Sequence, residues 1–254
     1  MGSLHRLDVG CADASVIIAD TATFLVDCHN IADYSGLLPA SKTVRGVFIT
    51  HQHSDHYSGL EYLKAEGYAI EWLIYSPYER RYEDKSVTID EWREFNGLRE
   101  YFEEQGTESR RAFGQESFDK PYWTPDGLKF WMLGPKRNTA TSDTRTLHDA
   151  CLVIRADLGN RTCTFTGDAS DANLAGVATI DNICGDILHA SHHASLEGAN
   201  LTFVKKCNAK WTVISTASGK YENVPHPTAL KRYADNSSEG VWRTDVKGSC
   251  KWTF

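Results

Sequence analysis

The chain has 254 residues, of which 41% are hydrophobic and 24% charged, and its formal net charge is −7. This length and composition are typical of one globular unit with a sizeable core, so we expect residues 1–254 to form a single domain. No apolar stretch approaches the length of a membrane span and no signal-type segment opens the chain, which predicts a cytoplasmic protein without membrane contact. The negative charge argues against a large basic face that coats nucleic acid, but it allows local phosphate contacts.

The cysteines point to reduced thiols. They are odd in number and scattered, and none forms a Cys-x-x-Cys pair, which argues against a disulfide framework and against a zinc ribbon. We expect most of them to be buried. The seven are Cys11, Cys28, Cys151, Cys163, Cys184, Cys207 and Cys250.

Short apolar runs bounded by Gly, Asp, Asn or Pro alternate with helical segments along the chain. The runs predict strands at 14–18, 23–26, 47–49, 72–75, 128–133, 151–154, 162–165, 187–188, 211–214 and 250–253. Helices are predicted at 54–66, 88–105 and 227–235, the first two stopped by glycine and the third opened by proline. This mixture predicts an α/β fold in which helices cover sheets in layers.

The hydrophilic segment 76–124 carries many aromatic residues among its charges. They could form a surface for base stacking or for a protein partner. The spacing of Trp92, Phe95 and Phe102 instead favours the buried stripe of a surface helix, and we prefer that interpretation.

The most informative motif is His51-Gln-His53-Ser-Asp55-His56, which directly follows the apolar run 47–49. Imidazoles favour zinc and similar ions, and carboxylates harden a site for metals that polarise oxygen substrates. His51 and His53, two residues apart, can point the same way, whereas adjacent Asp55 and His56 diverge. The motif therefore predicts ligands for two metal ions.

Three further ligand candidates follow or precede apolar runs. Asp168 follows a predicted strand, Gly167 lets the backbone turn there, and a carboxylate can bridge two ions. His148, with Asp149 in reserve, could complete the first ion's ligands beside His51 and His53. His226, held between two prolines, could complete the second ion's ligands beside Asp55 and His56.

The adjacent His192 and His193 could be ligands, proton donors or histidines that support the ligands by hydrogen bonds. Because both sets of ligands are already filled, we prefer a catalytic role, in which one imidazole protonates the departing oxygen. Asp55 is a candidate for a catalytic as well as a ligand role.

Together these residues resemble the metallo-β-lactamase superfamily. Within the superfamily the sequence resembles one branch more than the others, namely the soluble metallo-hydrolase domain of the DNA-uptake protein ComEC and its stand-alone relatives. The motifs that carry it span nearly the whole chain: Asp8-Val9-Gly10 with Asp13-Ala14, Leu25-Val26-Asp27, Thr166-Gly167-Asp168, His192-His193-Ala194-Ser195, His226-Pro227, and Arg243-Thr244-Asp245 with Gly248.

The resemblance implies a four-layer αββα sandwich with a dinuclear centre at one sheet edge. By analogy His51, His53 and His148 hold one ion, Asp55, His56 and His226 the other, Asp168 bridges them, and His192 is the general acid. His53 and His148 replace ligands that are often Asp and Asn in the branch. Both changes favour zinc, although manganese stays open.

The function that these observations predict is a metal-dependent phosphodiesterase or nuclease. The substrate would be a nucleic acid or a small nucleotide, including cyclic ones. The negative charge favours short substrates, which a protein partner could help to bind. One alternative is a hydrolase of a lactone, thioester or lactam. Another is a non-catalytic regulatory subunit of a multi-protein assembly, for example in defence.

Overall fold

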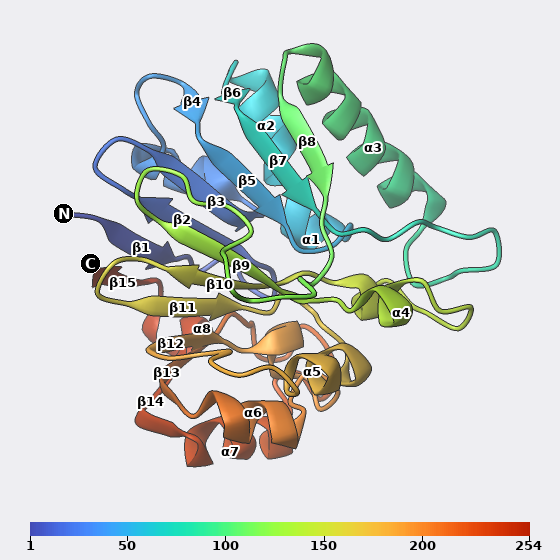
Figure 1. The fold of residues 1–254 in the computed structure, drawn as a ribbon, viewed down its shortest axis with the longest axis vertical. Coiled ribbons are helices and arrows are strands. Elements are labelled where there is room, and N and C mark those ends of the chain that lie inside the picture. Colours follow the sequence, from blue (N-terminus) through green and yellow to red (C-terminus); the bar gives the residue numbers. More distant parts are fainter.

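Two β-sheets pack face to face, with helices on their outer sides, in the computed structural model of residues 1–254 (Figure 1). The seven-stranded sheet has the order β15-β1-β2-β3-β5-β7-β8 and the six-stranded sheet the order β14-β13-β12-β11-β10-β9. The first contains β1 (Ser3–Arg6), β2 (Ala14–Ile18), β3 (Thr23–Cys28), β5 (Gly46–Ile49), β7 (Trp72–Tyr75), β8 (Glu108–Arg111) and β15 (Cys250–Thr253). The second contains β9 (Lys129–Gly134), β10 (Val153–Asp157), β11 (Thr162–Phe165), β12 (Ile187–His189), β13 (Ala209–Ile214) and β14 (Ser237–Arg243).

The helices form the two outer layers and the connections at the sheet edges. They are α1 (Ser54–Tyr57), α2 (Gly59–Ala65), α3 (Ile89–Glu104), α4 (Arg137–Ala140), α5 (Asp171–Val177), α6 (Leu201–Cys207), α7 (Pro227–Asp235) and α8 (Thr244–Lys247). Three 3₁₀ turns, η1 (Ile31–Leu37), η2 (His148–Ala150) and η3 (Ser191–Ala194), and a small pair of strands, β4 (Thr43–Val44) and β6 (Ala69–Ile70), complete the chain. All helices are too short or too polar to cross a membrane.

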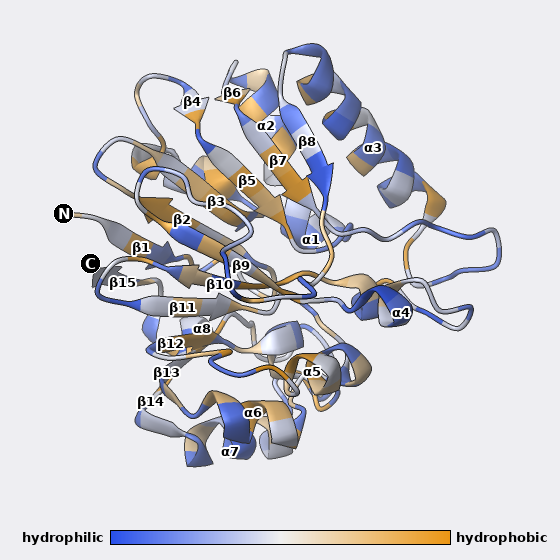
Figure 2. Ribbon diagram, viewed as in Figure 1, coloured by the Kyte–Doolittle hydropathy of each residue, from blue (hydrophilic) through white to orange (hydrophobic).

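Three hydrophobic clusters hold the layers together. In β5, Val47 and Ile49 face α2 and α3, whereas Phe48 faces the other sheet, as expected for alternating side chains in a strand buried on both faces. Phe48 and Phe130 pack against each other between the sheets, with tilted rings whose centroids are 4.8 Å apart. Figure 2 shows these apolar strands beneath the mixed surface of α3. The predicted αββα sandwich is therefore confirmed.

The predicted helices are confirmed with small changes. The predicted helix 54–66 is divided at Ser58 into α1 and α2, while Thr88 caps the N-terminus of α3 through a capping box with Glu91. Phe95 and Phe102 are buried, as the packing interpretation requires. Strands β1, β8 and β14 were not predicted, because their sequences are polar and β8 and β14 lie at sheet edges. All seven cysteines are free thiols and only Cys184 is partly exposed.

Strand direction places the functional motifs at one edge. Strands β3, β5, β7 and β8 run parallel in one sheet and β11 to β14 run parallel in the other, so their carboxyl ends gather at common edges. Strand β10 is antiparallel to β11, so the residues just before β10 lie at the same edge as those just after β11. In Figure 1 this edge lies near α1 and α5, away from both chain termini.

Candidate metal centre

The predicted ligands come from segments that follow or precede strands at this edge. His51 lies two residues beyond β5 and Asp168 three residues beyond β11. His148 lies in η2, just before β10. Gly167 has a φ of +45°, and a Cβ there would lie 2.4 Å from Thr50 Oγ1, so the turn that presents Asp168 requires glycine as predicted.

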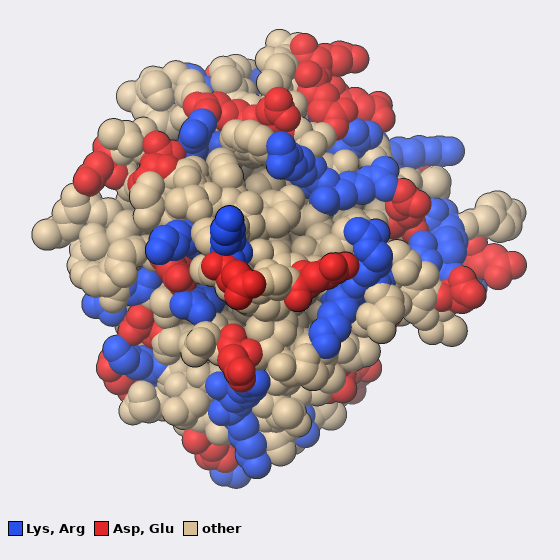
Figure 3. All heavy atoms as spheres, in the orientation of Figure 1, with Lys and Arg blue, Asp and Glu red and all other residues tan.

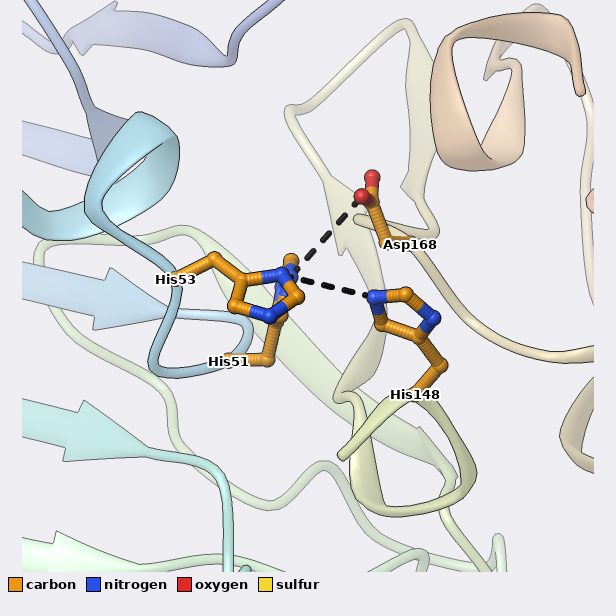
Figure 4. Close-up of side chains that lie close together, drawn as sticks. All are labelled: His51, His53, His148 and Asp168. Atoms are coloured by element: carbon orange, nitrogen blue, oxygen red, sulfur yellow. Dashed lines mark hydrogen bonds and ion pairs between the residues drawn. The ribbon is translucent and has the colours of Figure 1, made fainter. Parts of the chain in front are cut away.

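Four of these residues form a first group, whose potential ligand atoms all lie within 4.8 Å of one another: His51, His53, His148 and Asp168. His53 Nδ1 lies 3.1 Å from His51 Nε2 and 3.4 Å from His148 Nε2. His51 Nε2 lies 3.8 Å from Asp168 Oδ2. Figure 4 shows the four side chains converging, with His51 and His53 on the segment after β5 and His148 and Asp168 each on another segment.

A second group adjoins the first and consists of Asp55, His56 and His193. The two carboxylate oxygens of Asp55 lie 3.9 Å from His56 Nε2 and 3.6 Å from His193 Nε2. Asp168 reaches this group too, with Oδ1 3.4 Å from His56 Nε2 and Oδ2 3.7 Å from His193 Nε2. Asp168 therefore lies between the two groups, as a bridging ligand would.

Three atoms at this meeting point are buried without a hydrogen-bond partner: His56 Nε2, His193 Nε2 and Asp168 Oδ1. Buried polar atoms are normally paired, and such a set of nitrogen and oxygen donors is what a zinc-type or manganese-type ion would satisfy. The donor set therefore fits two divalent metal ions.

Neighbouring groups fix the histidine rings. In three rings, the nitrogen that points away from the ligand groups lies within hydrogen-bond distance of an oxygen. The pairs are His53 Nε2 with Ser86 O (2.6 Å), His56 Nδ1 with Asp27 Oδ2 (2.8 Å) and His193 Nδ1 with Ser215 O (3.0 Å). An outward nitrogen that donates its hydrogen leaves the other nitrogen unprotonated and free to bind a metal. Asp27, in addition, accepts hydrogen bonds from the backbone N–H and the hydroxyl of Thr50.

The electrostatics of the two groups differ. Burial lowers the pKa of His148 to about 3, because a charged imidazole would lose its hydration. Burial also opposes charge on His193, but the carboxylates of Asp168 and Asp55 outweigh it and raise the pKa of His193 to about 9. The carboxylates therefore make the second group a place that favours positive charge.

His192 lies beside both groups but faces the opening. Its backbone is left-handed (φ 51°, ψ 48°), and its N–H donates to Gly167 O at 3.0 Å. Its Nε2 lies 3.7 Å from Asp168 Oδ2, and the side chain is 29% exposed. His192 therefore has solvent access that the buried His193 lacks.

His226 is the predicted ligand that the structure does not bring into either group. It caps α7, and its Nδ1 accepts a hydrogen bond from the Thr228 N–H at 3.1 Å. His193 occupies the position that was predicted for His226 beside Asp55 and His56. The sequence held a signal for this placement, because η3 follows β12 almost directly, whereas His226 is separated from β13 by residues 215–225. Asp149, the reserve candidate, accepts hydrogen bonds from Thr146 and Ser170 instead.

A buried charged network that the sequence did not predict adjoins the second group. Asp13 is fully buried and pairs with the guanidinium of Arg6, and its Oδ1 lies 3.2 Å from His189 Nε2. Its Oδ2 lies 3.7 Å from His56 Nδ1. Burial and the positive charge of Arg6 lower the pKa of His189 to about 4. Asp13 thus joins this buried network to His56 of the second group.

A cavity of about 540 Å³ opens onto the two groups. It is lined by His29, His53, Ser54, Asp55, Glu91, Asp168, His192, His193, Lys220, Tyr221 and Val224. His29 Nδ1 lies 2.8 Å from Ser58 Oγ. Burial, with a smaller contribution from the positive charge of Lys220, lowers the pKa of His29. The cavity combines the candidate ligands with side chains that a substrate could contact.

An αββα sandwich with two adjoining His/Asp groups at one edge defines a class of α/β metalloproteins. The chain belongs to the metallo-beta-lactamase superfamily, whose family model matches residues 8–214. Members are mostly metal-dependent hydrolases and commonly bind dinuclear centres, consistent with the groups described above. No curated protein matches the chain.

Solved structures share the fold at low sequence identity. YhfI from Bacillus subtilis, a metallo-beta-lactamase fold protein, is 16% identical with a TM-score of 0.59, and the match covers 99% of each chain. Igni18, a metallo hydrolase from Ignicoccus hospitalis, is 13% identical with a TM-score of 0.57, again over 99% of each chain. A diphosphatase from the PhnP family is 13% identical with a TM-score of 0.53, over 100% of this chain and 98% of that one. At these identities the likeness concerns the fold.

Proposed function

We propose that the protein is a metal-dependent phosphodiesterase or nuclease that cleaves a nucleic acid or a small, possibly cyclic, nucleotide at a dinuclear centre. The observation that carries the proposal is the position of His192, which lies 3.7 Å from the shared carboxylate of Asp168 and is a partly exposed imidazole that lines the cavity. A proton donor beside two metal positions suits the cleavage of an ester that has a poor leaving group.

His51, His53 and His148 would hold one ion, Asp55, His56 and His193 the other, and Asp168 would contact both. Bound Zn²⁺ or Mn²⁺ ions would supply positive charge that polarises a phosphoryl group and acidifies a water molecule. In this assignment His193 serves as a ligand, in place of the catalytic role that the sequence suggested. His226, which lies in neither group, is not needed for it.

The protein's own groups orient the reaction. The Gly167 carbonyl holds the left-handed turn at His192 and thereby keeps the imidazole at the cavity wall. From there His192 would protonate the departing oxygen. Asp55, whose side chain is 26% exposed, would act in catalysis by facing the attacking water as well as by holding an ion.

Two further observations favour a phosphodiester. The segment His192-His193-Ala194-Ser195 resembles the corresponding segment of the ComEC branch. One protein of the same fold is a diphosphatase, which supports chemistry at phosphorus more generally. Figure 3 shows acidic and basic side chains interspersed over one face, with some basic side chains gathered near β8 and α4. This face does not have the uniform positive charge of a protein that coats long nucleic acids, which favours short substrates.

The test is a substrate panel with added Zn²⁺ or Mn²⁺. We expect hydrolysis of bis(p-nitrophenyl) phosphate, followed by cleavage within a panel of single-stranded DNA, double-stranded DNA, RNA and cyclic nucleotides. Nitrocefin and an acyl lactone are the comparison substrates. Turnover of the lactone or of nitrocefin without phosphodiester cleavage would replace this proposal with the alternative hydrolase.

Metal content separates an enzyme from a non-catalytic subunit. We expect the purified protein to contain two equivalents of metal by mass spectrometry and Asp168→Ala to lose at least one. Asp181→Ala is the control, because Asp181 is an aspartate with a side chain 94% exposed outside both groups. A protein that binds no metal at all would contradict the enzymatic proposal.

A further inference from the structure

Part of the cavity wall is a turn that contains Lys220 and Tyr221. Lys220 is the one lysine among the side chains that line the cavity, and Tyr221 is an aromatic residue that is 51% exposed. Lys220 Nζ lies 5.7 Å from the centroid of the Tyr221 ring. A cation and an exposed ring therefore stand side by side at the cavity that the two ligand groups also line.

The ammonium group of Lys220 has no carboxylate partner within the protein. Lys220 makes no ion pair, unlike Lys206 with Asp181 and Lys231 with Asp235. The carboxylate of Glu91, which lines the same cavity, is engaged by the backbone N–H and the hydroxyl of Thr88 at the start of α3. The remaining lining carboxylates, Asp55 and Asp168, belong to the ligand groups. The ammonium group of Lys220 is therefore free to pair with an anionic group of a ligand in the cavity.

The turn is anchored from behind. The Lys220 N–H donates to Ala217 O at 3.2 Å, and the Val224 N–H donates to Tyr221 O at 3.4 Å. Ser218 donates to Asp245 Oδ2 through its N–H at 3.2 Å and its hydroxyl at 2.6 Å, and Arg243 holds the same carboxylate at 2.7 Å. The Arg243-Thr244-Asp245 motif thus fixes the turn that carries Lys220 and Tyr221.

We infer that this turn binds the nucleotide part of the substrate, with Lys220 contacting a phosphate oxygen and Tyr221 stacking on a base. The inference rests on the proposed function and narrows its substrate class, because it favours phosphodiesters that carry a nucleobase over phosphodiesters that carry none. Ammonium groups pair with phosphate oxygens, and exposed aromatic rings stack on bases with little sequence preference. Lys220 and Tyr221 act as positioning residues, because the bond is cleaved at the two ligand groups.

The experiment compares thymidine 5′-p-nitrophenyl phosphate, which carries a base, with methyl p-nitrophenyl phosphate, which does not. We expect Lys220→Ala to raise KM for both substrates by roughly tenfold to a hundredfold, with kcat less affected, and Lys220→Arg to restore most of the affinity. Tyr221→Ala should raise KM about tenfold for the thymidine substrate alone. Tyr221→Phe keeps the ring and should resemble wild type, and Lys231→Ala is the control for an unrelated surface lysine.

Binding of thymidine 5′-monophosphate to the metal-loaded protein, measured by calorimetry, gives a readout that does not depend on turnover. If wild type cleaves neither substrate, the proposed function fails, and calorimetry still decides the inference: weaker binding by Lys220→Ala and Tyr221→Ala supports it. Unchanged KM and unchanged binding in both alanine variants would overturn it. Absence of nucleotide binding by wild type would overturn it as well.

Discussion

His56 Nδ1 and Asp27 Oδ2 lie 2.8 Å apart, although His56 belongs to α1 and Asp27 to β3. Asp27 is 2% exposed and also accepts two hydrogen bonds from Thr50. The carboxylate thus joins the end of β3, the end of β5 and the start of α1. It fixes the ring of His56 so that Nε2 faces the second ligand group.

Replacing Asp27 should weaken metal binding without removing a ligand. In Asp27→Ala the His56 ring loses its hydrogen-bond acceptor, and we expect roughly tenfold to a hundredfold weaker affinity for one of the two ions. Competition with a zinc chelator measures this affinity. Asp27→Asn keeps an oxygen acceptor and should lose less. Equal affinities for all three proteins would show that His56 is oriented by other contacts.

Replacing each of the two candidates for the last ligand of the second ion, in separate variants, tests the centre most directly. His193→Ala should release one equivalent of metal, because His193 Nε2 is a buried atom without another partner. His226→Ala should keep both equivalents, since His226 Nδ1 is bound to the Thr228 N–H. Mass spectrometry of the purified variants gives the count. The opposite pattern would restore His226 as the ligand that the sequence predicted.

The general-acid role of His192 predicts a dependence on the leaving group. His192→Gln should slow a substrate with a poor alkoxide leaving group by a factor of about 100 or more, as expected for the loss of general-acid catalysis. A p-nitrophenolate leaves without protonation, so bis(p-nitrophenyl) phosphate should be affected much less. The ratio of the two kcat values is the measurement. An equal loss with both substrates would indicate that His192 supports the centre by another route.

The layers of the fold could be predicted from the sequence because apolar runs and glycine stops are local signals. The runs at 72–75 and 162–165 match β7 and β11, and 227–235 matches α7. Strands β8 and β14 escaped prediction since edge strands are stabilised by pairing on one side and need few apolar residues. Their polar sequences, Glu108–Arg111 above all, resemble loops.

The first ligand group could be predicted because its members adjoin strand ends in the sequence. The second could be predicted only in part. Choosing between His193 and His226 depends on how far each histidine lies from the end of its strand, and on which of them turns inward, which are properties of the folded chain. The same holds for Asp13, which is buried against Arg6 from β1 and gives no local signal of its role.

His189 makes the stability of the protein depend on pH in a defined window. Its pKa is lowered to about 4, by burial first and then by the charge of Arg6, from 6.5 in the unfolded chain. Between these values the unfolded chain binds a proton at His189 and the folded chain does not, so stability falls as the pH falls below 6.5. From pH 7 to pH 5 this residue should remove about 2 kcal/mol from the free energy of unfolding. Urea unfolding at the two pH values measures the difference. The variant His189→Gln cannot titrate at this position, so its free energy of unfolding should fall less on acidification, whatever its stability at pH 7. An identical fall in both proteins would mean that His189 is protonated in the folded state as readily as in the unfolded chain.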